Sequence, residues 1–140
     1  MYAVAFADRC RAKATEDITS LAVFGFPEPL LRAWASSIPR LNQLQLDAIN
    51  EFGLLDGHHL VVSAPTSSGK TMIGELAALQ GALTRKRALF LFPLKALVND
   101  KYRHFNELYG EFGIRVIRAT GDSAADEIVP LMRGITTCAS

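Results

Sequence analysis

The stretch Ala64-Pro65-Thr66-Ser67-Ser68-Gly69-Lys70-Thr71 decides how the rest of this chain is interpreted. It follows the apolar run Leu60-Val61-Val62 and precedes an amphipathic segment that extends to Leu83. A strand, a tight loop and a helix in this order form the setting of a phosphate-binding P-loop. The sequence therefore predicts a loop whose backbone N–H groups, together with the N-terminus of the following helix, bind an anion.

Three residues of this loop have the chemistry that such a site needs. Gly69 allows the backbone to approach a phosphate without a Cβ in the way. Lys70 can reach the β- and γ-phosphates, and the Thr71 hydroxyl is suited to Mg²⁺. Ala64 stands where the general pattern has a glycine, so the strict motif is not met. The alternative interpretation is an ordinary helix that is capped by a serine or a threonine.

The composition limits the class of protein. A chain of 140 residues with 49% apolar and 21% charged residues is typical of one globular domain. A net charge of +1 neither demands a nucleic-acid partner nor excludes a local basic face. Cys10 and Cys138 have no CxxC spacing, so we expect free thiols in a reducing compartment. His58, His59 and His104 show no metal-ligand spacing.

The chain has no sequence feature of a membrane or secreted protein. No apolar run reaches the roughly 18 residues that a membrane-spanning helix requires. Residues 1–7 are too short for the apolar region of a signal peptide and lead directly into Asp8 and Arg9. We therefore expect a cytoplasmic protein.

Two parts of the chain differ in pattern. Residues 1–37 form an N-terminal helical lead, in which Pro27 suits the first turn of a helix that ends near Ser37. Residues 38–140 begin with a second expected helix, 42–52, and then change to alternating strand and helix patterns.

The second part predicts an α/β fold. Three apolar runs alternate with two helical patterns, at 69–83 and 94–109, which favours a parallel sheet with its strands buried on both faces. Ligands in such sheets bind at the carboxyl ends of the strands, where the P-loop, Pro93 to Lys95, and Thr120 to Asp122 all fall. The three expected strands are residues 60–63, 88–92 and 114–117.

Four short segments, in this order, resemble the sequence motifs of superfamily 2 helicases in the DEAD/DExH group. The amino-acid sequences of these segments are most similar to those of the Ski-type DExH branch. The resemblance covers about residues 38–123. In this family a leading alanine in motif I, such as Ala64, is normal. The segments are residues 41–49 for the Q motif, 64–71 for motif I, 93–102 for motif Ia and 120–122 for the TGD element.

The resemblance implies the first part of a RecA-like P-loop NTPase domain that uses ATP and Mg²⁺. Gln45, the glutamine of the Q motif, would read the adenine edge with its amide; the alternative is a surface glutamine on a helix. Phe24 or Phe26 could pack on adenine, although core packing is the alternative for both. Lys70 and Thr71 would be catalytic, and Thr71 would bind Mg²⁺. The implied nucleotide-binding residues are Gln45, Ala64, Pro65, Thr66, Ser67, Ser68, Gly69, Lys70 and Thr71.

The resemblance also implies contact with a strand of RNA or DNA through its backbone. Such contacts fix position without reading sequence, so binding would be independent of sequence. Lys95 would hold a phosphate together with the N–H groups of its helix; a solvated lysine is the alternative. We interpret Lys101, Arg103, Arg115 and Arg118 as solvated charges, and residues 85–87 as a solubility feature. The implied strand-binding residues are Pro93, Leu94, Lys95, Thr120 and Gly121.

One motif of the family is missing from this sequence. Motif II holds Mg²⁺ and positions the attacking water, but Asp126 and Glu127 lie in a helix-like pattern and are not accepted as that motif. The second RecA-like half and its arginine fingers are absent as well. We therefore expect an ATP- and nucleic-acid-binding part that is inactive as a hydrolase on its own. The alternatives are a regulatory nucleotide-binding module and a truncated product without function.

The C-terminal end differs from the family pattern. A buried strand is expected after Gly134, but Ile135 to Ser140 does not match one. We consider a change of reading frame after about Gly134, with a natural or cloned short end as the alternative. A chain that ends before motif II should also leave the strand at 60–63 with unpaired edges.

Overall fold

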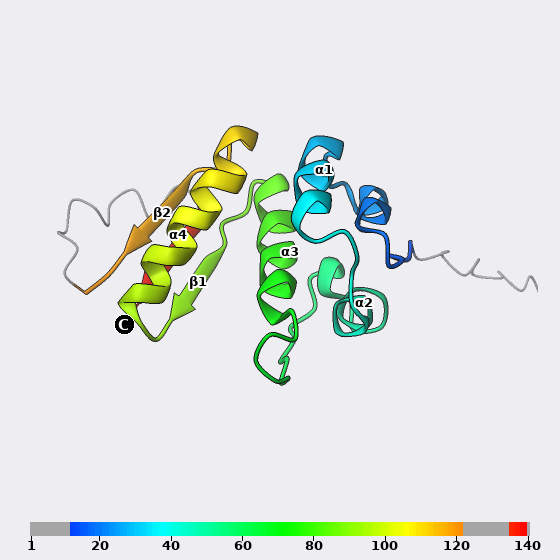
Figure 1. The fold of residues 1–140 in the computed structure, drawn as a ribbon, viewed down its shortest axis with the longest axis horizontal. Coiled ribbons are helices and arrows are strands. Elements are labelled where there is room, and N and C mark those ends of the chain that lie inside the picture. The colour runs from blue at the N-terminus through cyan, green and yellow to red at the C-terminus, as the bar shows by residue number, and fades with distance from the viewer. Residues whose placement is uncertain (1–11, 122–134, 140) are drawn as a thin grey trace, which may run out of the picture.

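The computed structural model describes residues 12–121 and 135–139 (Figure 1). Its helices and strands alternate as expected from Lys70 onward. In chain order the elements are the 3₁₀ helix η1 (Ile18–Phe24), α1 (Glu28–Ser37), α2 (Gln43–Asn50), the 3₁₀ helix η2 (Leu54–Asp56), α3 (Lys70–Leu83), β1 (Leu89–Phe92), α4 (Lys95–Tyr109), the 3₁₀ helix η3 (Gly110–Phe112), β2 (Val116–Ala119) and β3 (Ile135–Ala139).

The three described strands form one sheet in the order β1-β3-β2. Both pairings are parallel, with Leu89 opposite Thr136 in one and Val116 opposite Ile135 in the other. The carboxyl ends of β1 and β2 therefore meet at the same edge of the sheet, one strand apart. This edge is where the sequence predicted the contacts to nucleic acid.

Two strand predictions need correction. Residues 60–63 form no strand and pair with no strand among the described residues, and Val61 is 99% exposed. Strand β1 is not buried on both faces, because Leu89 is 60% and Leu91 72% exposed. An apolar run predicts burial only where a second layer is present to cover it. In the described residues only one face of the sheet has such a layer.

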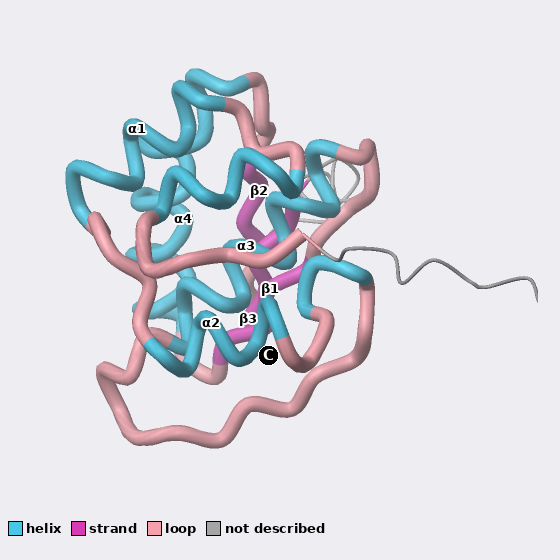
Figure 2. Tube along the Cα trace, turned by 90° about the vertical axis from the view of Figure 1, so that its right-hand side faces the viewer, coloured by secondary structure: helices cyan, strands magenta, loops and turns pink. Residues whose placement is uncertain are grey.

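Helix α4 supplies this layer. It contacts all three strands, and Figure 1 shows it lying across the sheet, with α3 beside it and α1 and α2 on the far side of α3. The Phe105 ring of α4 lies 5.1 Å from the Phe90 ring of β1, which fixes the helix on the sheet. Figure 2 looks at the molecule from the side of α1 and α2, so the strands lie behind these helices.

The N-terminal lead packs into the same hydrophobic core as the α/β part. Leu31 and Trp34 of α1 are each 1% exposed and belong to one cluster with Leu76 of α3 and Phe105 of α4. Phe26 is also buried, with its ring 5.5 Å from that of Trp34, so core packing is its role here. The division at residue 38 stays a prediction, because the packing is continuous across it.

The last described strand differs from expectation. Ile135–Ala139 was expected not to form the buried strand of the family, yet its backbone lies in the centre of the sheet and pairs on both sides.

Among the helices of residues 12–121 and 135–139, none is long and apolar enough to cross a membrane.

Replacing Leu31 with alanine should destabilise the whole chain. The side chain is 1% exposed, so its loss leaves a cavity and should lower the free energy of unfolding by about 3 kcal/mol. Urea unfolding followed by Trp34 fluorescence measures this change. Val23→Ala is the control, because Val23 is 62% exposed and should change stability by less than about 0.5 kcal/mol. Equal stability of both variants would show that α1 does not pack on the core.

Candidate nucleotide and nucleic-acid site

The expected P-loop connects residues 60–63 to the start of α3. Two of its residues have left-handed backbone, Ser67 with φ 62° and Gly69 with φ 89°. The ammonium group of Lys70, the first residue of α3, donates to the backbone carbonyls of Ala64 and Pro65 and lies 3.4 Å from Ser68 Oγ. The loop therefore curves around the charge of its own lysine.

A capping box at the start of α2 holds this loop. Asn42 Oδ1 accepts a hydrogen bond from the Gln45 backbone N–H at 3.0 Å, and Gln45 Oε1 accepts one from the Asn42 N–H at 2.9 Å. The amide nitrogens of the same side chains face the loop. Asn42 Nδ2 donates to the Ser68 carbonyl at 2.9 Å, and Gln45 Nε2 donates to the Gly69 carbonyl at 3.3 Å. Two side chains thus join the start of α2 to the P-loop.

Gln45 is buried and hydrogen-bonded within the protein, which differs from the expectation. It is 3% exposed, so the surface-glutamine interpretation is wrong. Its amide oxygen caps α2 and its amide nitrogen holds Gly69, so both groups already have a partner within the protein. Its contact with adenine stays a prediction. Sequence reasoning could have found the cap, because asparagine followed three residues later by glutamine is its signature, but not the bond to a loop 24 residues away.

Gly69 is needed for close packing as well as for its backbone angle. A Cβ at this position would lie 2.6 Å from Gln45 Nε2 and 2.7 Å from Asn42 Nδ2. From the sequence, the missing side chain of Gly69 is expected to leave room for a phosphate. In the structure it also makes room for the capping box.

Two open clefts flank α3, one at its N-terminal end and the other along its whole length. The first, of about 380 Å³, brings together four of the predicted residues, Gln45, Ser67, Gly69 and Thr71. The second, of about 890 Å³, is lined by Lys70 and by residues of η2, α3 and the segment 84–88. The larger cleft holds only one predicted residue. The first cleft is therefore the better candidate for the nucleotide.

The predicted strand-binding residues lie at one edge of the sheet. Pro93 and Leu94 connect β1 to α4, and Lys95 is the first residue of α4. Thr120 and Gly121 directly follow β2, whose end lies at the same edge because the pairing is parallel. Lys95 and Thr120 each already interact with another group of the protein.

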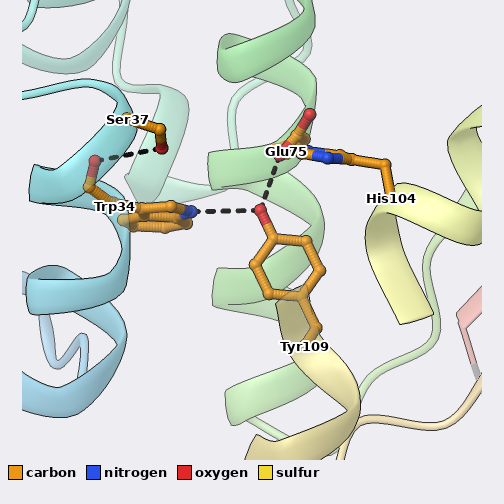
Figure 3. A network of polar contacts seen from close by, with 5 residues as sticks. All are labelled: Trp34, Ser37, Glu75, His104 and Tyr109. Carbon is orange, nitrogen blue, oxygen red and sulfur yellow. Dashed lines mark hydrogen bonds and ion pairs between the residues drawn. The ribbon is translucent and has the colours of Figure 1, made fainter. Parts of the chain in front are cut away.

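A buried polar network joins three helices beside the first cleft (Figure 3). The Trp34 Nε1–H of α1 donates to the Tyr109 hydroxyl of α4 at 3.1 Å, and this hydroxyl donates to Glu75 Oε2 of α3 at 2.5 Å. His104 Nε2 lies 3.9 Å from the same carboxylate oxygen. Glu75 is 6% exposed, so its carboxylate depends on these partners.

The buried setting of Tyr109 favours the protonated form of its hydroxyl. Burial first, and then the charge and the hydrogen bond of Glu75, raise the pKa of Tyr109 far above its ordinary value. The hydroxyl therefore stays a donor to the carboxylate over the whole physiological range. Sequence reasoning missed this network, because its members lie far apart along the chain and none of them carries a motif.

Two acidic residues that the sequence analysis considered and rejected cannot be placed. Asp126 and Glu127, the rejected candidates for motif II, lie outside the described residues. Within the described part of the chain, no group of three or more histidine, cysteine, aspartate or glutamate residues could hold a metal ion.

Comparison with known families decides the class of this protein. The family model of the DEAD/DEAH box helicase matches residues 42–138, which is more than half of the chain. The chain belongs to the DEAD/DEAH box helicase family. The resemblance read from the four motifs is therefore confirmed. The match extends past Gly134, so the interpretation that family sequence stops there is wrong.

Individual relatives of this helicase chain act on different nucleic acids. It is 44% identical over 88 residues to the DExH-box ATP-dependent RNA helicase DExH15 of Arabidopsis thaliana chloroplasts, covering 63% of this chain and 7% of that protein. It is 42% identical over 84 residues to the ATP-dependent DNA helicase Hel308 of Methanocaldococcus jannaschii, covering 55% and 7%. The chain therefore spans less than a tenth of the length of these relatives.

A solved structure supports the RecA-like helicase fold. The DUF1998 helicase MrfA bound to DNA and AMPPNP matches 82% of this chain and 17% of its own, with a TM-score of 0.69 and 29% identity. MrfA bound to DNA alone gives a TM-score of 0.67.

Replacing Gly69 with alanine should cost more stability than the same change at Gly25. Both glycines have φ 89°, so both variants carry the same left-handed strain of about 1–2 kcal/mol. Nothing lies within 4 Å of a Cβ at Gly25, whereas at Gly69 the two amide nitrogens that bond the loop, those of Asn42 and Gln45, would have to shift. We expect a further loss of about 1–3 kcal/mol for Gly69→Ala in urea unfolding. Equal losses would mean that the capping box does not hold the loop.

Replacing Tyr109 with phenylalanine should destabilise the chain by about 2 kcal/mol. The Glu75 carboxylate would stay buried without its hydroxyl donor, and hydrogen bonds to charged groups contribute about this much. Tyr102→Phe is the control, because Tyr102 is only half-buried and its hydroxyl has no hydrogen bond within the described residues. Thermal unfolding compares the two variants. Similar melting temperatures would contradict the role of the network.

Proposed function

We propose that this chain is the part of an ATP-dependent helicase that binds ATP with Mg²⁺ and contacts one strand of RNA or DNA. The observation that carries the proposal is the position of Lys70 and Thr71 at the first turn of α3, behind a loop that curves around the lysine charge. A helix N-terminus and a curved backbone together favour an anion at this point.

The residues fit a triphosphate. The Lys70 ammonium is bonded to neutral carbonyl groups, which bind a cation less strongly than phosphate oxygens do. Thr71 is exposed in the first cleft beside Gln45 and Gly69, so its hydroxyl is available to a cation that accompanies the phosphates. Bound Mg²⁺ would neutralise phosphate charge, and Thr71 is the residue that would hold it. The other nucleotide contacts proposed are those of residues 64–69.

Contact with nucleic acid rests on the edge formed by the ends of β1 and β2. Lys95 opens α4 and is exposed, and its helix N-terminus adds further donors for a phosphate. Thr120 and Gly121 would add a hydroxyl and a backbone N–H. The named relatives include an RNA helicase and a DNA helicase. The proposed partner is therefore a strand of either RNA or DNA. Contacts to phosphate alone make binding independent of sequence.

These 140 residues are not expected to hydrolyse ATP on their own. The family uses motif II to position the attacking water, and no such motif is identified in this sequence. The second candidate function is regulatory: a module that binds nucleotide or a nucleic-acid strand without hydrolysis could regulate a partner by occupying that ligand.

Replacing Lys70 with alanine should weaken ATP binding at least about tenfold, which is ~1.4 kcal/mol. The cause is the lost charge pairing with the β- and γ-phosphates. Calorimetric titration with ATP and Mg²⁺ measures the affinity. Lys13→Ala is the control, because Lys13 is equally charged, exposed and outside the loop. If both variants bind as tightly as the unchanged chain, the P-loop assignment is wrong.

A further inference from the structure

A polar cleft lies between α4 and β2, and four of its six lining residues, Arg118 among them, lie outside the predicted motifs. It measures about 350 Å³ and is open to solvent. Its lining comes from one exposed side of α4 and from a single residue of β2. The lining residues are Asn99, Tyr102, Arg103, Asn106, Glu107 and Arg118.

Arg118 is held in one orientation within this cleft. Its Nη1 donates to Asn99 Oδ1 at 2.7 Å, and its guanidinium carbon lies 5.3 Å from the centre of the Tyr102 ring. A hydrogen bond and a ring contact together fix a side chain that is otherwise rich in rotamers, and fixing it in advance lowers the cost of binding a ligand. This arrangement differs from the solvated charge that the sequence analysis expected.

The fixed guanidinium still has donors for a ligand. Arginine presents five N–H donors in a planar fork, of which the bond to Asn99 uses one. Within the described residues, neither Arg118 nor Arg103 has a carboxylate within ion-pair distance. Glu107 lines the same cleft and opposes an anion, but two cations outnumber this one carboxylate. The ligand chemistry that matches a fixed arginine fork beside a second arginine is a phosphate.

The cleft adjoins the edge where a strand would bind. Arg118 precedes Thr120 by two residues, so the two side chains lie on the same face of the extended chain, about 7 Å apart. Asn99 lies one helical turn after Lys95, a rise of about 6 Å. A nucleic-acid backbone held at Lys95 and Thr120 would therefore reach Arg118 with its next phosphates.

We propose that Arg118, fixed by Asn99 and Tyr102, forms a phosphate-binding subsite that continues the nucleic-acid contact from the ends of β1 and β2 onto the side of α4. The subsite rests on the proposed function, because it extends the same strand-binding edge. Its ligand is a phosphodiester of a single strand, and ATP is the other source of phosphate that the experiment distinguishes.

The test measures binding of a fluorescently labelled single-stranded oligonucleotide by anisotropy at several salt concentrations. For Arg118→Gln we expect an affinity about tenfold lower, since one charge-assisted contact is lost. The slope of log Kobs against log salt should fall by about 0.7, the value for one phosphate contact on a single strand. Arg118→Lys should keep the slope, because the charge remains, and recover only part of the affinity, because lysine has no fork.

Arg115→Gln is the matched control. It removes the same charge three residues away, from an exposed position before β2 that does not line the cleft. Its affinity and salt slope should equal those of the unchanged chain. Thermal unfolding of all variants shows whether each is folded, and only variants with an unchanged melting temperature are compared.

The outcomes separate the subsite from the proposed function. If the unchanged chain binds the oligonucleotide and Arg118→Gln binds equally well, the subsite is wrong and the strand-binding edge stands. If Arg118→Gln weakens ATP binding instead, the cleft binds nucleotide and the strand assignment is overturned. If the unchanged chain does not bind the oligonucleotide at all, the proposed strand contact is wrong and the subsite with it.

Discussion

Two side-chain amides hold the functional end of this molecule together. Asn42 and Gln45 close the first turn of α2 with their oxygens and bind the carbonyls of Ser68 and Gly69 with their nitrogens. These bonds fix the position of the loop relative to α2, and Gly69 directly precedes Lys70, the first residue of α3. The left-handed backbone at Gly69 and the absence of a Cβ there are both conditions for this contact. A helix cap in one part of the chain thus helps to shape the proposed anion site in another.

A single buried carboxylate has a similar role for the helices. Glu75 follows Thr71 by one helical turn, so it moves with the P-loop helix, while Tyr109 and His104 belong to α4 and Trp34 to α1. The helices that begin at the two candidate binding loops are therefore joined through one charged group. A carboxylate in this position is costly without donors, which makes the relative placement of α3, α4 and α1 specific. Apolar packing alone would tolerate more variation in that placement.

Local patterns predicted the local structure well. The helices beginning near Pro27, Asn42 and Gly69 and the family itself followed from residue periodicity, turn residues and short motifs. Non-local features could not be predicted in this way. Whether Leu91 is covered, or whether residues 60–63 have a neighbouring strand, depends on segments elsewhere in the chain. The same limit applies to the site. The Q motif identified Gln45 as a site residue, but its bond to Gly69 and the contact between Arg118 and Tyr102 could be seen only in the folded structure.

The bonds of Lys70 have a consequence for how nucleotide affinity should be understood. Its ammonium group is already coordinated by the carbonyl oxygens of Ala64 and Pro65. The proposed binding of nucleotide at this loop would therefore be a ligand substitution, in which phosphate oxygens would replace peptide oxygens around a cation that is present throughout. The affinity found in a titration with ATP would then equal the difference between two sets of oxygen partners and not the full strength of the lysine–phosphate attraction. A loop that binds its own lysine more weakly would hold the same nucleotide more tightly.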